Sequence, residues 1–275
     1  MDFDYYEYEL DSKDALLSNS GNSSKYDWPM FEMVRPLDNI VGLKIVECQI
    51  PFSFYTINSE NNTFKVMVNS IEYVITIPEG NYSASTLTTT LLGLLTTTEP
   101  TFTVTFDSIT GKFTFSCVPA FYFTFSATSV YTFLGFNIGQ TTTGTILTST
   151  NVAEITGPNY LYINSDSLGS LIQLYLPSGS SIVEGGVGPE IAKVPIETNP
   201  NGVIFWQDPV PQHFFNLHNL LQLKSIDLYL TLGTSTSKPL KLNGLGFSVK
   251  IGLLIQTNES IISKDQVGSK RSRVY

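Results

Sequence analysis

Two stretches near the C-terminus, in which every second residue is apolar, constrain the fold of this chain more than any other feature. The first runs from Ser225 to Leu232 and the second from Leu245 to Gln256, and the connection between them is rich in Gly, Ser, Thr, Pro and Asn. A period of two residues is that of a β-strand with one buried face, and it does not fit a helix. Two such strands with a turn-forming connection predict a hairpin near the end of the chain.

Runs with the same period recur through most of the preceding chain. They predict strands at 39–52, 63–69, 72–78, 101–106, 113–116, 121–127, 146–155, 160–163, 171–176 and 204–215. In the first of them the apolar set changes phase near Ile45–Glu47, which indicates a β-bulge or a strand that serves two sheets. Pro51 has no amide donor, so this strand should leave its ladder there. Many short strands without alternating helices predict an all-β protein, an antiparallel β-sandwich of the single jelly-roll type.

One or two short helices are predicted as insertions in this sandwich. The residues that recur at helical spacing in the first are Ala84, Leu87, Leu91 and Leu94. Ser83 or Ser85 can cap this helix, because a serine oxygen accepts a hydrogen bond from a free amide of the first turn. A second short helix or turn is expected within 128–139, with Thr128 as its possible cap.

The predicted domain organisation is one central domain with two ends that lack a regular pattern. Residues 1–36 form an N-terminal arm, 37–256 form the single jelly-roll domain, and 257–275 form a polar, basic C-terminal tail. The Gly- and Pro-rich stretch 177–202 is expected to be a long surface loop of the domain. The arm ends in an apolar cluster that includes Trp28, Met30, Phe31 and Met33. Such an arm orders against a neighbouring subunit or packs on its own domain, and the sequence leaves both possibilities open.

Composition, net charge and the distribution of apolar residues argue against several classes of protein. Charged residues make up 14% of the chain, whereas about 25% is usual in soluble domains. A net charge of −9 argues against a nucleic-acid-binding body, so contact with nucleic acid is expected only through the basic C-terminal tail. The sequence has no apolar run that approaches the ~18 residues of a membrane-spanning helix. The acidic start lacks the order of a signal peptide, so we expect a protein made in the cell interior and not secreted.

The residues that usually carry chemistry do not form a catalytic or metal-binding pattern. His213 and His218 are the only histidines, and their odd separation misses the spacing of helical metal ligands. The stretch Asn164–Ser167 has oxygen donors suited to calcium, but a loop that bonds its own backbone is the favoured interpretation. Cys48 and Cys117 lie in strand-like runs and are expected to be reduced core residues rather than a disulfide. We therefore expect no enzyme activity, no cofactor and no metal.

Several motifs, taken in their order along the chain, give it a family resemblance. The strongest are Ile77-Pro78-Glu79-Gly80-Asn81-Tyr82, Leu134-Gly135-Phe136 and Leu242-Asn243-Gly244. With the first predicted strand they extend over residues 40–256, and in this order the chain resembles the penton proteins of virophages and polinton-like viruses. Residues 1–36 and 177–202 match no motif of that family.

The resemblance implies a structural capsid protein of the virion. It implies a single upright jelly roll that forms homopentamers and closes the five-fold vertices of an icosahedral shell. Further copies of the chain, neighbouring major capsid capsomers and internal cement proteins are the implied partners, and we expect the apolar cluster and the acidic arm to contact those neighbours. The candidate interface residues are Trp28, Met30, Phe31, Met33, Tyr229 and Lys250, with Thr231 and Ser248 as further outward positions of the C-terminal strands.

The alternative is a viral spike or a receptor- or carbohydrate-binding module on a jelly roll. Such a module would be trimeric and would carry a polar-aromatic pocket, with 177–202 as its expected place. The oligomeric mass distinguishes the two hypotheses, because a vertex protein contains five copies and a spike contains three.

Overall fold

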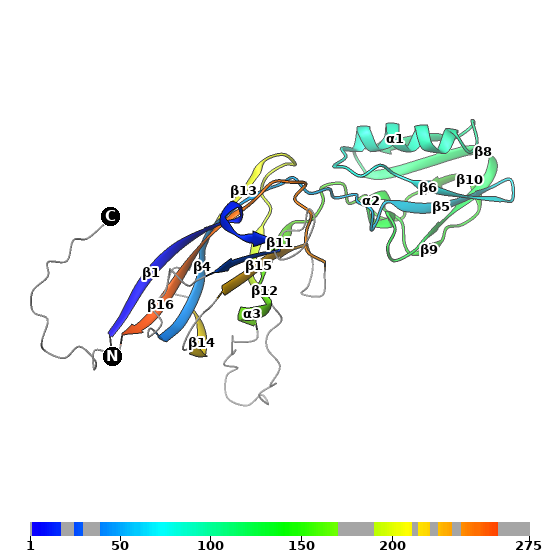
Figure 1. The fold of residues 1–275 in the computed structure, drawn as a ribbon. Coiled ribbons are helices and arrows are strands. Elements are labelled where there is room, and N and C mark those ends of the chain that lie inside the picture. Colours follow the sequence, from blue (N-terminus) through cyan, green and yellow to red (C-terminus); the bar gives the residue numbers. More distant parts are fainter. Residues whose placement is uncertain are drawn as a thin grey trace, which may run out of the picture. The chain divides into compact units, whose positions relative to one another are not determined.

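The computed structural model divides the chain into two compact units. Unit 1 contains Met1–Ser53 and Tyr160–Tyr275, and unit 2 contains Phe54–Asn159. The structure describes residues 2–17, 25–29, 39–169, 190–210, 214–220, 225–232 and 238–257. Among them strands predominate (Figure 1), and the paired strands are antiparallel. The all-β prediction is confirmed, but the expected single domain over 37–256 is interrupted by a unit of its own.

The described residues of unit 1 form two sheets, called sheet one and sheet two. Sheet one contains, in spatial order, β1 (Asp2–Asp11), β16 (Ser248–Thr257), β4 (Asn39–Pro51) and β13 (Val203–Gln207), with β14 (Phe215–Leu220) also paired to β4. Sheet two contains β12 (Glu190–Pro195), β11 (Tyr160–Asn164), β15 (Ser225–Thr231), β3 (Tyr26–Pro29) and β2 (Leu16–Leu17). The short helices of this unit are η1 (Ser12–Asp14) and α3 (Asp166–Gly169).

The strand pairings of unit 1 have the order of a jelly roll. β13 and β14 pair with different parts of β4 and count as one strand, so that, with the two-residue β2 left aside, the described residues form eight strands. The first pairs with the eighth (β1 with β16), the second with the seventh (β3 with β15), the third with the sixth (β4 with β13) and the fourth with the fifth (β11 with β12). These pairs alternate between the two sheets, as when a long double ribbon rolls up. The jelly-roll prediction is confirmed.

The two C-terminal strands do not form the expected hairpin. β15 pairs with β11 and β3, whereas β16 pairs with β4 and β1, so the strands lie in different sheets. Each strand nevertheless buries the predicted apolar face; the buried residues are Ile226, Leu228 and Leu230 on β15, and Val249, Ile251, Leu253 and Ile255 on β16. The alternation identifies the buried face of a strand, but it does not identify the strand's partner.

Residues 1–36 supply strands of the jelly roll instead of a separate arm. β1 pairs with β16 along its whole length, as Figure 1 shows, and β3 pairs with β15. Trp28 on β3 is 2% exposed, packs edge-on against Phe247, and donates its Nε1–H to the Asp11 carbonyl oxygen at 2.8 Å. The described part of 1–36 therefore packs on its own domain. Met30, Phe31 and Met33 lie outside the described residues.

β4 contains the bulge that its change of phase predicts. Lys250 pairs with Glu47, but the next residue of β16 pairs with Ile45, which leaves Val46 as the extra residue. The bulge keeps Leu43 and Ile45 before it and Cys48 and Ile50 after it on the buried face, and a second register shift at Val41 does the same for Ile40. β4 ends at Pro51, as predicted.

Part of the stretch expected as a long loop is a strand. β12 lies within 177–202 and pairs with β11. Residues 170–189, which include the expected strand 171–176, and the tail from residue 258 onward lie outside the described residues.

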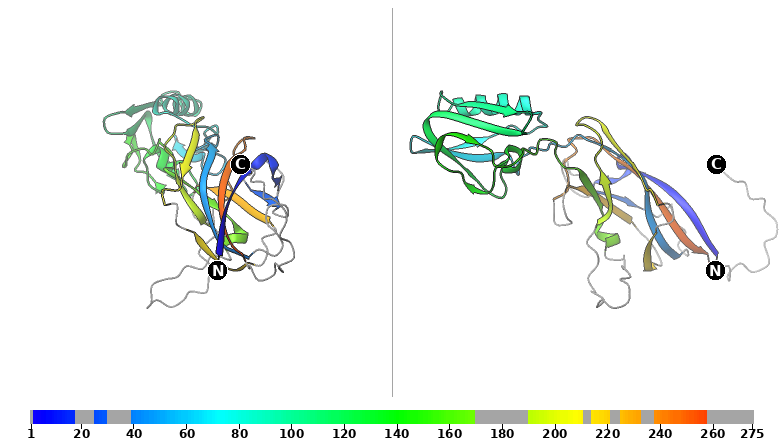
Figure 2. Two further views of the ribbon diagram at one scale, coloured as in Figure 1. Left: turned by 90° about the vertical axis from the view of Figure 1, so that its left-hand side faces the viewer. Right: turned by 180° about the vertical axis from the view of Figure 1, so that it is seen from behind.

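Unit 2 is a single sheet covered on one face by a helix. Its strands are, in spatial order, β10 (Gly144–Thr148), β8 (Lys112–Phe125), β5 (Thr63–Val68) and β6 (Ile71–Thr76), with β7 (Thr103–Asp107) and β9 (Gly139–Gln140) also paired to β8. Its helices are α1 (Ala84–Thr96) and α2 (Tyr131–Leu134). Figures 1 and 2 show α1 along one face of the sheet, where its buried leucines are Leu87, Leu91 and Leu95. The core beneath it is rich in phenylalanine: Phe64, Phe102, Phe113, Phe115, Phe121, Phe123, Phe125 and Phe136.

The two helices of unit 2 differ in how well their ends are predicted. Ser83 caps α1 as expected, since its Oγ accepts from the Thr86 amide and the Thr86 hydroxyl accepts from the Ser83 amide. α2 is shorter than expected, with Val130 and not Thr128 at its N-terminal boundary.

The strand expected at 146–155 is also shorter and ends at Thr148. Among the described residues, no helix is long and apolar enough to cross a membrane.

Candidate functional site

The polar stretch Asn164–Ser167 surrounds a carboxylate of the protein itself. Asp227 on β15 accepts hydrogen bonds from the Ser165 hydroxyl at 3.0 Å, from the amides of Asp166 and Ser167 at 2.9 Å each, and from the Ser167 hydroxyl. Burial opposes ionisation of Asp227, but these hydrogen bonds outweigh it and lower the pKa of the carboxyl. The favoured interpretation holds only in part: the Ser165 hydroxyl accepts from the Leu168 amide at 3.0 Å, but most hydrogen bonds of the stretch go to the distant Asp227 carboxylate. Within the described residues, no group of three or more His, Cys, Asp or Glu is placed to hold a metal ion.

The expected interface residue Tyr229 belongs to the same buried cluster. Its hydroxyl donates to Asp166 Oδ1 at 2.8 Å, and Lys25 Nζ lies 5.3 Å from the centre of its ring and 2.7 Å from Asp166 Oδ2. Tyr229 is 5% exposed, and the neighbouring outward position Thr231 is fully buried. Asn164 donates to the Thr231 hydroxyl at 3.1 Å, and the Asn164 Oδ1 atom has no hydrogen-bond partner among the described residues. Tyr229 and Thr231 are thus buried within their own chain, whereas Lys25 and Asp166 beside Tyr229 are 28% and 57% exposed.

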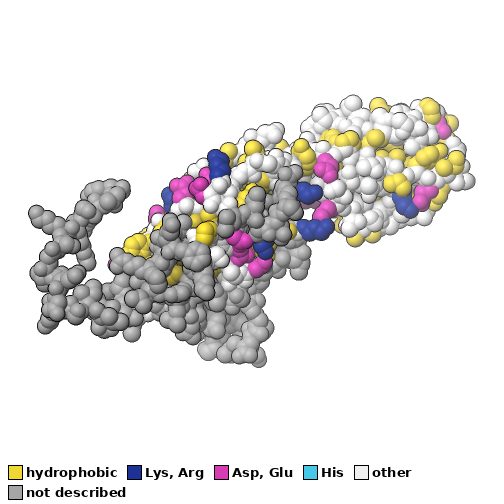
Figure 3. Space-filling model, in the orientation of Figure 1, with side chains coloured by type: hydrophobic (Ala, Val, Ile, Leu, Met, Phe, Trp, Pro, Cys, Tyr) yellow, Lys and Arg dark blue, Asp and Glu magenta, His cyan; other side chains and the backbone are white. Residues whose placement is uncertain are grey.

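Lys250, by contrast, lies on the outer face of sheet one. The pairing register places Glu9, Lys250 and Glu47 in one row across β1, β16 and β4, and Lys250 Nζ lies 2.9 Å from Glu47 Oε1. The hydrogen bond with Glu47 is the main reason why the pKa of Lys250 is raised, and Glu7 and Glu9 raise it further. Figure 3 shows acidic side chains (magenta) beside lysines (dark blue) over this sheet.

A second lysine on this face is enclosed by aromatic rings. Lys44 on β4 is 7% exposed, and its Nζ lies 5.0 Å from the centre of the Tyr5 ring and 4.9 Å from that of Phe214. Gly252 of β16 lies between β1 and β4, and a Cβ there would lie 2.6 Å from the Tyr5 hydroxyl. The Tyr5 hydroxyl donates to Glu7 at 2.7 Å. The glycine therefore lets an aromatic side chain of β1 cross β16 and reach the lysine.

Apolar side chains are exposed at both margins of sheet one. Phe3 and Tyr5 on β1 are 52% and 43% exposed, and Val203 and Phe205 on β13 are 58% and 60% exposed. The register pairs Asp11 with Ser248, Ser248 with Gln49, and Gln49 with Phe205, so the odd-numbered residues of β1 share the outer face with Phe205. These residues are not among the interface residues predicted from the sequence, although the alternation of aromatic and acidic residues in β1 is typical of an exposed strand.

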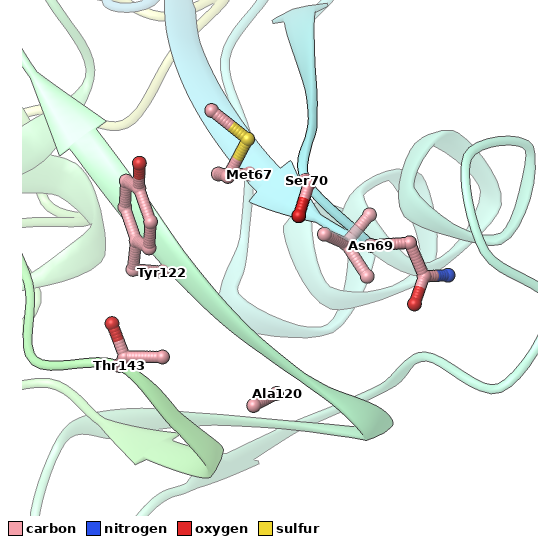
Figure 4. Close-up of a pocket in the computed structure, with 7 residues that line it drawn as sticks. Met67, Asn69, Ser70, Ala120, Tyr122 and Thr143 are labelled. Atoms are coloured by element: carbon pink, nitrogen blue, oxygen red, sulfur yellow. The ribbon is translucent and has the colours of Figure 1, made fainter.

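Unit 2 has a surface with few charges, and a pocket opens on it. Figure 3 shows its visible face as mostly uncharged, with scattered apolar side chains (yellow). The pocket has a volume of about 340 Å³ and is lined by Met67, Val68, Asn69, Ser70, Ala120, Tyr122 and Thr143. In Figure 4, Met67, Tyr122 and Thr143 surround a common space, whereas the Asn69 amide points away and donates to Glu99 at 3.2 Å. The lining contains no carboxylate, histidine, lysine or cysteine, so it offers no general acid or base of neutral pH.

The three motifs that carry the family resemblance hold turns in place. Asn81 accepts from the Thr56 amide at 2.8 Å and donates to the Phe54 carbonyl oxygen at 3.0 Å. Gly135 ends α2 with φ +73°, and a Cβ there would lie 2.3 Å from a backbone oxygen. Asn243 donates to the Ser53 carbonyl oxygen at 2.7 Å, and the Ser53 hydroxyl donates to the Leu242 carbonyl oxygen at 2.6 Å. These residues therefore fix the backbone of their turns.

The remaining residues singled out by the sequence are placed as follows. Cys48 and Cys117 are free and buried, as predicted, and they belong to different units. Ser248 on the outer face of sheet one pairs with Asp11 and Gln49. His213 lies outside the described residues, and only the backbone of His218 is described.

Comparisons with known proteins give similarities of structure only. A scan against protein-family models and a search of curated proteins find no match. The chain is similar to the crystal structure of the mavirus penton protein, with 13% identity, a TM-score of 0.49, and coverage of 93% of this chain and 100% of that chain. It is also similar to a chain of the cryo-EM structure of the Sputnik virophage, with 12% identity, a TM-score of 0.45, and coverage of 92% and 98%. The jelly-roll assignment rests on the strand pairings of unit 1 and not on these similarities.

Proposed function

We propose that this chain is a structural capsid protein that forms homopentamers and closes the five-fold vertices of an icosahedral viral shell. The copies contact one another through unit 1, and the assembled ring contacts neighbouring major capsid capsomers and internal cement proteins. The protein is made inside the host cell, resides in the virion and has no enzymatic role. The motif resemblance over residues 40–256 motivates this assignment, and the jelly roll of unit 1 is the fold that it implies.

The observation that carries the proposal is that sheet one has two different apolar margins. A closed ring needs heterologous contacts, in which one surface of a copy binds a different surface of the next. Phe3 and Tyr5 lie at the β1 margin, and Val203 and Phe205 lie at the opposite, β13 margin of the same face. Two dissimilar apolar surfaces on opposite margins of one sheet suit head-to-tail association better than a two-fold dimer. Lys250 lies between them on β16, where its ion pair with Glu47 keeps the middle of the face polar.

The test combines particle reconstruction with a margin variant. Phe205→Asp places a charge in the proposed contact, so we expect the variant to be missing from the vertices of particles that contain the wild-type chain. Ile109→Asp is the matched control, because Ile109 is 94% exposed in unit 2 and lies outside the proposed contact. We expect five copies of the 30.4 kDa chain at each vertex. Normal incorporation of Phe205→Asp, or vertices occupied by another protein, contradicts the proposal.

A trimeric receptor- or carbohydrate-binding module is the second candidate function, and the pocket of unit 2 favours it. Tyr122 offers a ring for stacking, and Ser70 and Thr143 offer hydroxyls, which suits a small neutral polar ligand such as a sugar. The pocket lies in unit 2, whereas the sequence suggested 177–202. A glycan-binding assay in which Tyr122→Ala loses the signal, together with a trimeric mass, would support this function over the vertex protein.

A further inference from the structure

The outer edge of β1 is acidic and open within the part of the chain that the structure describes. β1 pairs with β16 on one side, and no described strand pairs with its other side. Its exposed or half-buried side chains include Asp4, Glu7, Glu9 and Asp11. An open edge exposes backbone donors and acceptors to any chain that can pair with them, and proteins usually cover or charge such edges. Here the charge is of one sign, which attracts a basic segment.

The chain has such a segment in its C-terminal tail. Residues 264–275 contain Lys264, Lys270, Arg271 and Arg273 and a single acidic residue, Asp265. The tail leaves the jelly roll at Thr257, which pairs with Asp2 at the start of β1. At about 3.3 Å per residue, residues 258–275 reach up to about 60 Å, whereas the ten residues of β1 span about 33 Å. The tail therefore starts beside the open edge and is long enough to follow all of it.

We propose that residues 264–275 pair with the open edge of β1 in the same chain as an additional strand. β16 runs antiparallel to β1 and ends beside its first residues, so a tail that turns once runs parallel to β1. This direction brings Lys270, Arg271 and Arg273 to the second half of β1, where Glu7, Glu9 and Asp11 lie. Linkage within one chain gives the tail an effective concentration in the millimolar range, which favours its own β1 over that of another copy.

The added strand is compatible with the proposed ring but does not depend on it. Strand pairing uses backbone groups in the plane of the sheet, whereas Phe3 and Tyr5 project from its face. The tail therefore covers the edge against uncontrolled pairing and leaves the apolar margin to a neighbouring copy.

Hydrogen exchange on the monomeric fraction of the full chain tests the proposal. Alternate β1 amides do not bond to β16, and these are protected only if another strand pairs with them. We expect them to exchange about tenfold faster in the variant K270Q/R271Q/R273Q and in 1 M salt, because the ion pairs are then removed or screened. The control Q266A/S269A/S272A keeps the length and charge of the tail and should exchange like the wild type.

A charge-reversal pair gives a second, independent readout. E9K/D11K should lose the protection, and adding R271E/R273E to it should restore the protection. Equal exchange of these amides in the wild type and in K270Q/R271Q/R273Q would overturn the proposal. Protection that disappears on dilution would also overturn it, because the strand would then come from another copy. Neither result concerns five-fold assembly, so the proposed function stands or falls separately.

Discussion

Asp227 on β15 lies directly opposite Asp27 on β3, so two carboxylates face each other across one pair of strands. Burial first and then the charge of Asp227 raise the pKa of Asp27, while Lys25 acts against them. The pKa of Asp227 is lowered instead, because the Ser165–Ser167 loop donates hydrogen bonds to it. The pKa values of two paired aspartates are thus shifted in opposite directions. The loop lies beside Asp227 and stabilises the ionised form of that carboxyl.

The first prediction is that Asp227→Ala destabilises unit 1 by about 2–4 kcal/mol, because buried donors that lose a charged acceptor remain unsatisfied. Urea denaturation measures the change. Asp107→Ala is the control, since Asp107 also accepts from a backbone amide and a hydroxyl but is exposed to solvent; its loss should be clearly smaller than that of Asp227→Ala. Equal losses in the two variants would show that burial of the Asp227 network adds nothing.

Acid should weaken the native state through Asp227. Its native pKa lies below the ordinary value of 3.8, so its contribution is fully present above pH 3.8 and is lost as the pH falls through the lower native pKa. Urea midpoints of the wild type should therefore fall more steeply below pH 3.8 than those of Asp227→Asn, in which the titrating group is absent. Parallel curves for the two proteins contradict the prediction.

Asp27 should show the opposite dependence on pH. Its native pKa is raised from 3.8, so its contribution is present below pH 3.8 and is lost as the pH rises through the native pKa. Asp27→Asn should therefore stabilise the protein at pH 7 by about 0.5 kcal/mol, the size of a like-charge pair across strands, and should give no gain at pH 3. A gain of the same size at both pH values would indicate a packing effect.

Substitution of two glycines of unit 2 by alanine should change the stability of the protein in opposite directions. Gly135 has φ +73°, and a Cβ there would lie 2.3 Å from the Asn151 carbonyl oxygen, so Gly135→Ala should destabilise by more than about 2 kcal/mol. Gly93 lies in α1, and a Cβ added there would meet no atom within 4 Å outside its own helix backbone and chain neighbours. Gly93→Ala should stabilise by about 0.5–1 kcal/mol, because alanine loses less backbone freedom in a helix. Thermal unfolding of both variants measures the difference, and a loss at Gly93 contradicts it.

Cys48 should be unreactive in the native protein. Burial raises the pKa of its thiol to about 12, and the side chain is 1% exposed, so neither thiolate nor access is available at pH 8. Intact mass after iodoacetamide treatment should show no label on Cys48 until denaturant is added. Native labelling at a rate similar to that of a free thiol would mean that β4 opens readily.

The sequence by itself determined the local features of the fold. The period of two residues located most strands, and a change of phase located the bulge at Val46. Ser83 and the helical spacing after it located the start of α1. These features depend on side chains within a few residues of one another, so a linear pattern records them.

Only the tertiary structure decided which strands pair and which faces are covered. Backbone hydrogen bonds are nearly the same for every residue except proline, so the alternation in β15 and β16 identified buried faces but placed two strands of different sheets in one hairpin. The alternation in β15 places Tyr229 on the outward face. It is nevertheless buried, because α3 and Lys25, which are distant in sequence, cover it. Residues 2–11 alternate aromatic and acidic side chains but have no apolar face, since an edge strand needs only one partner and few buried side chains. The separation of unit 2 was equally invisible, because its strands follow the same period as those of the jelly roll into which it is inserted.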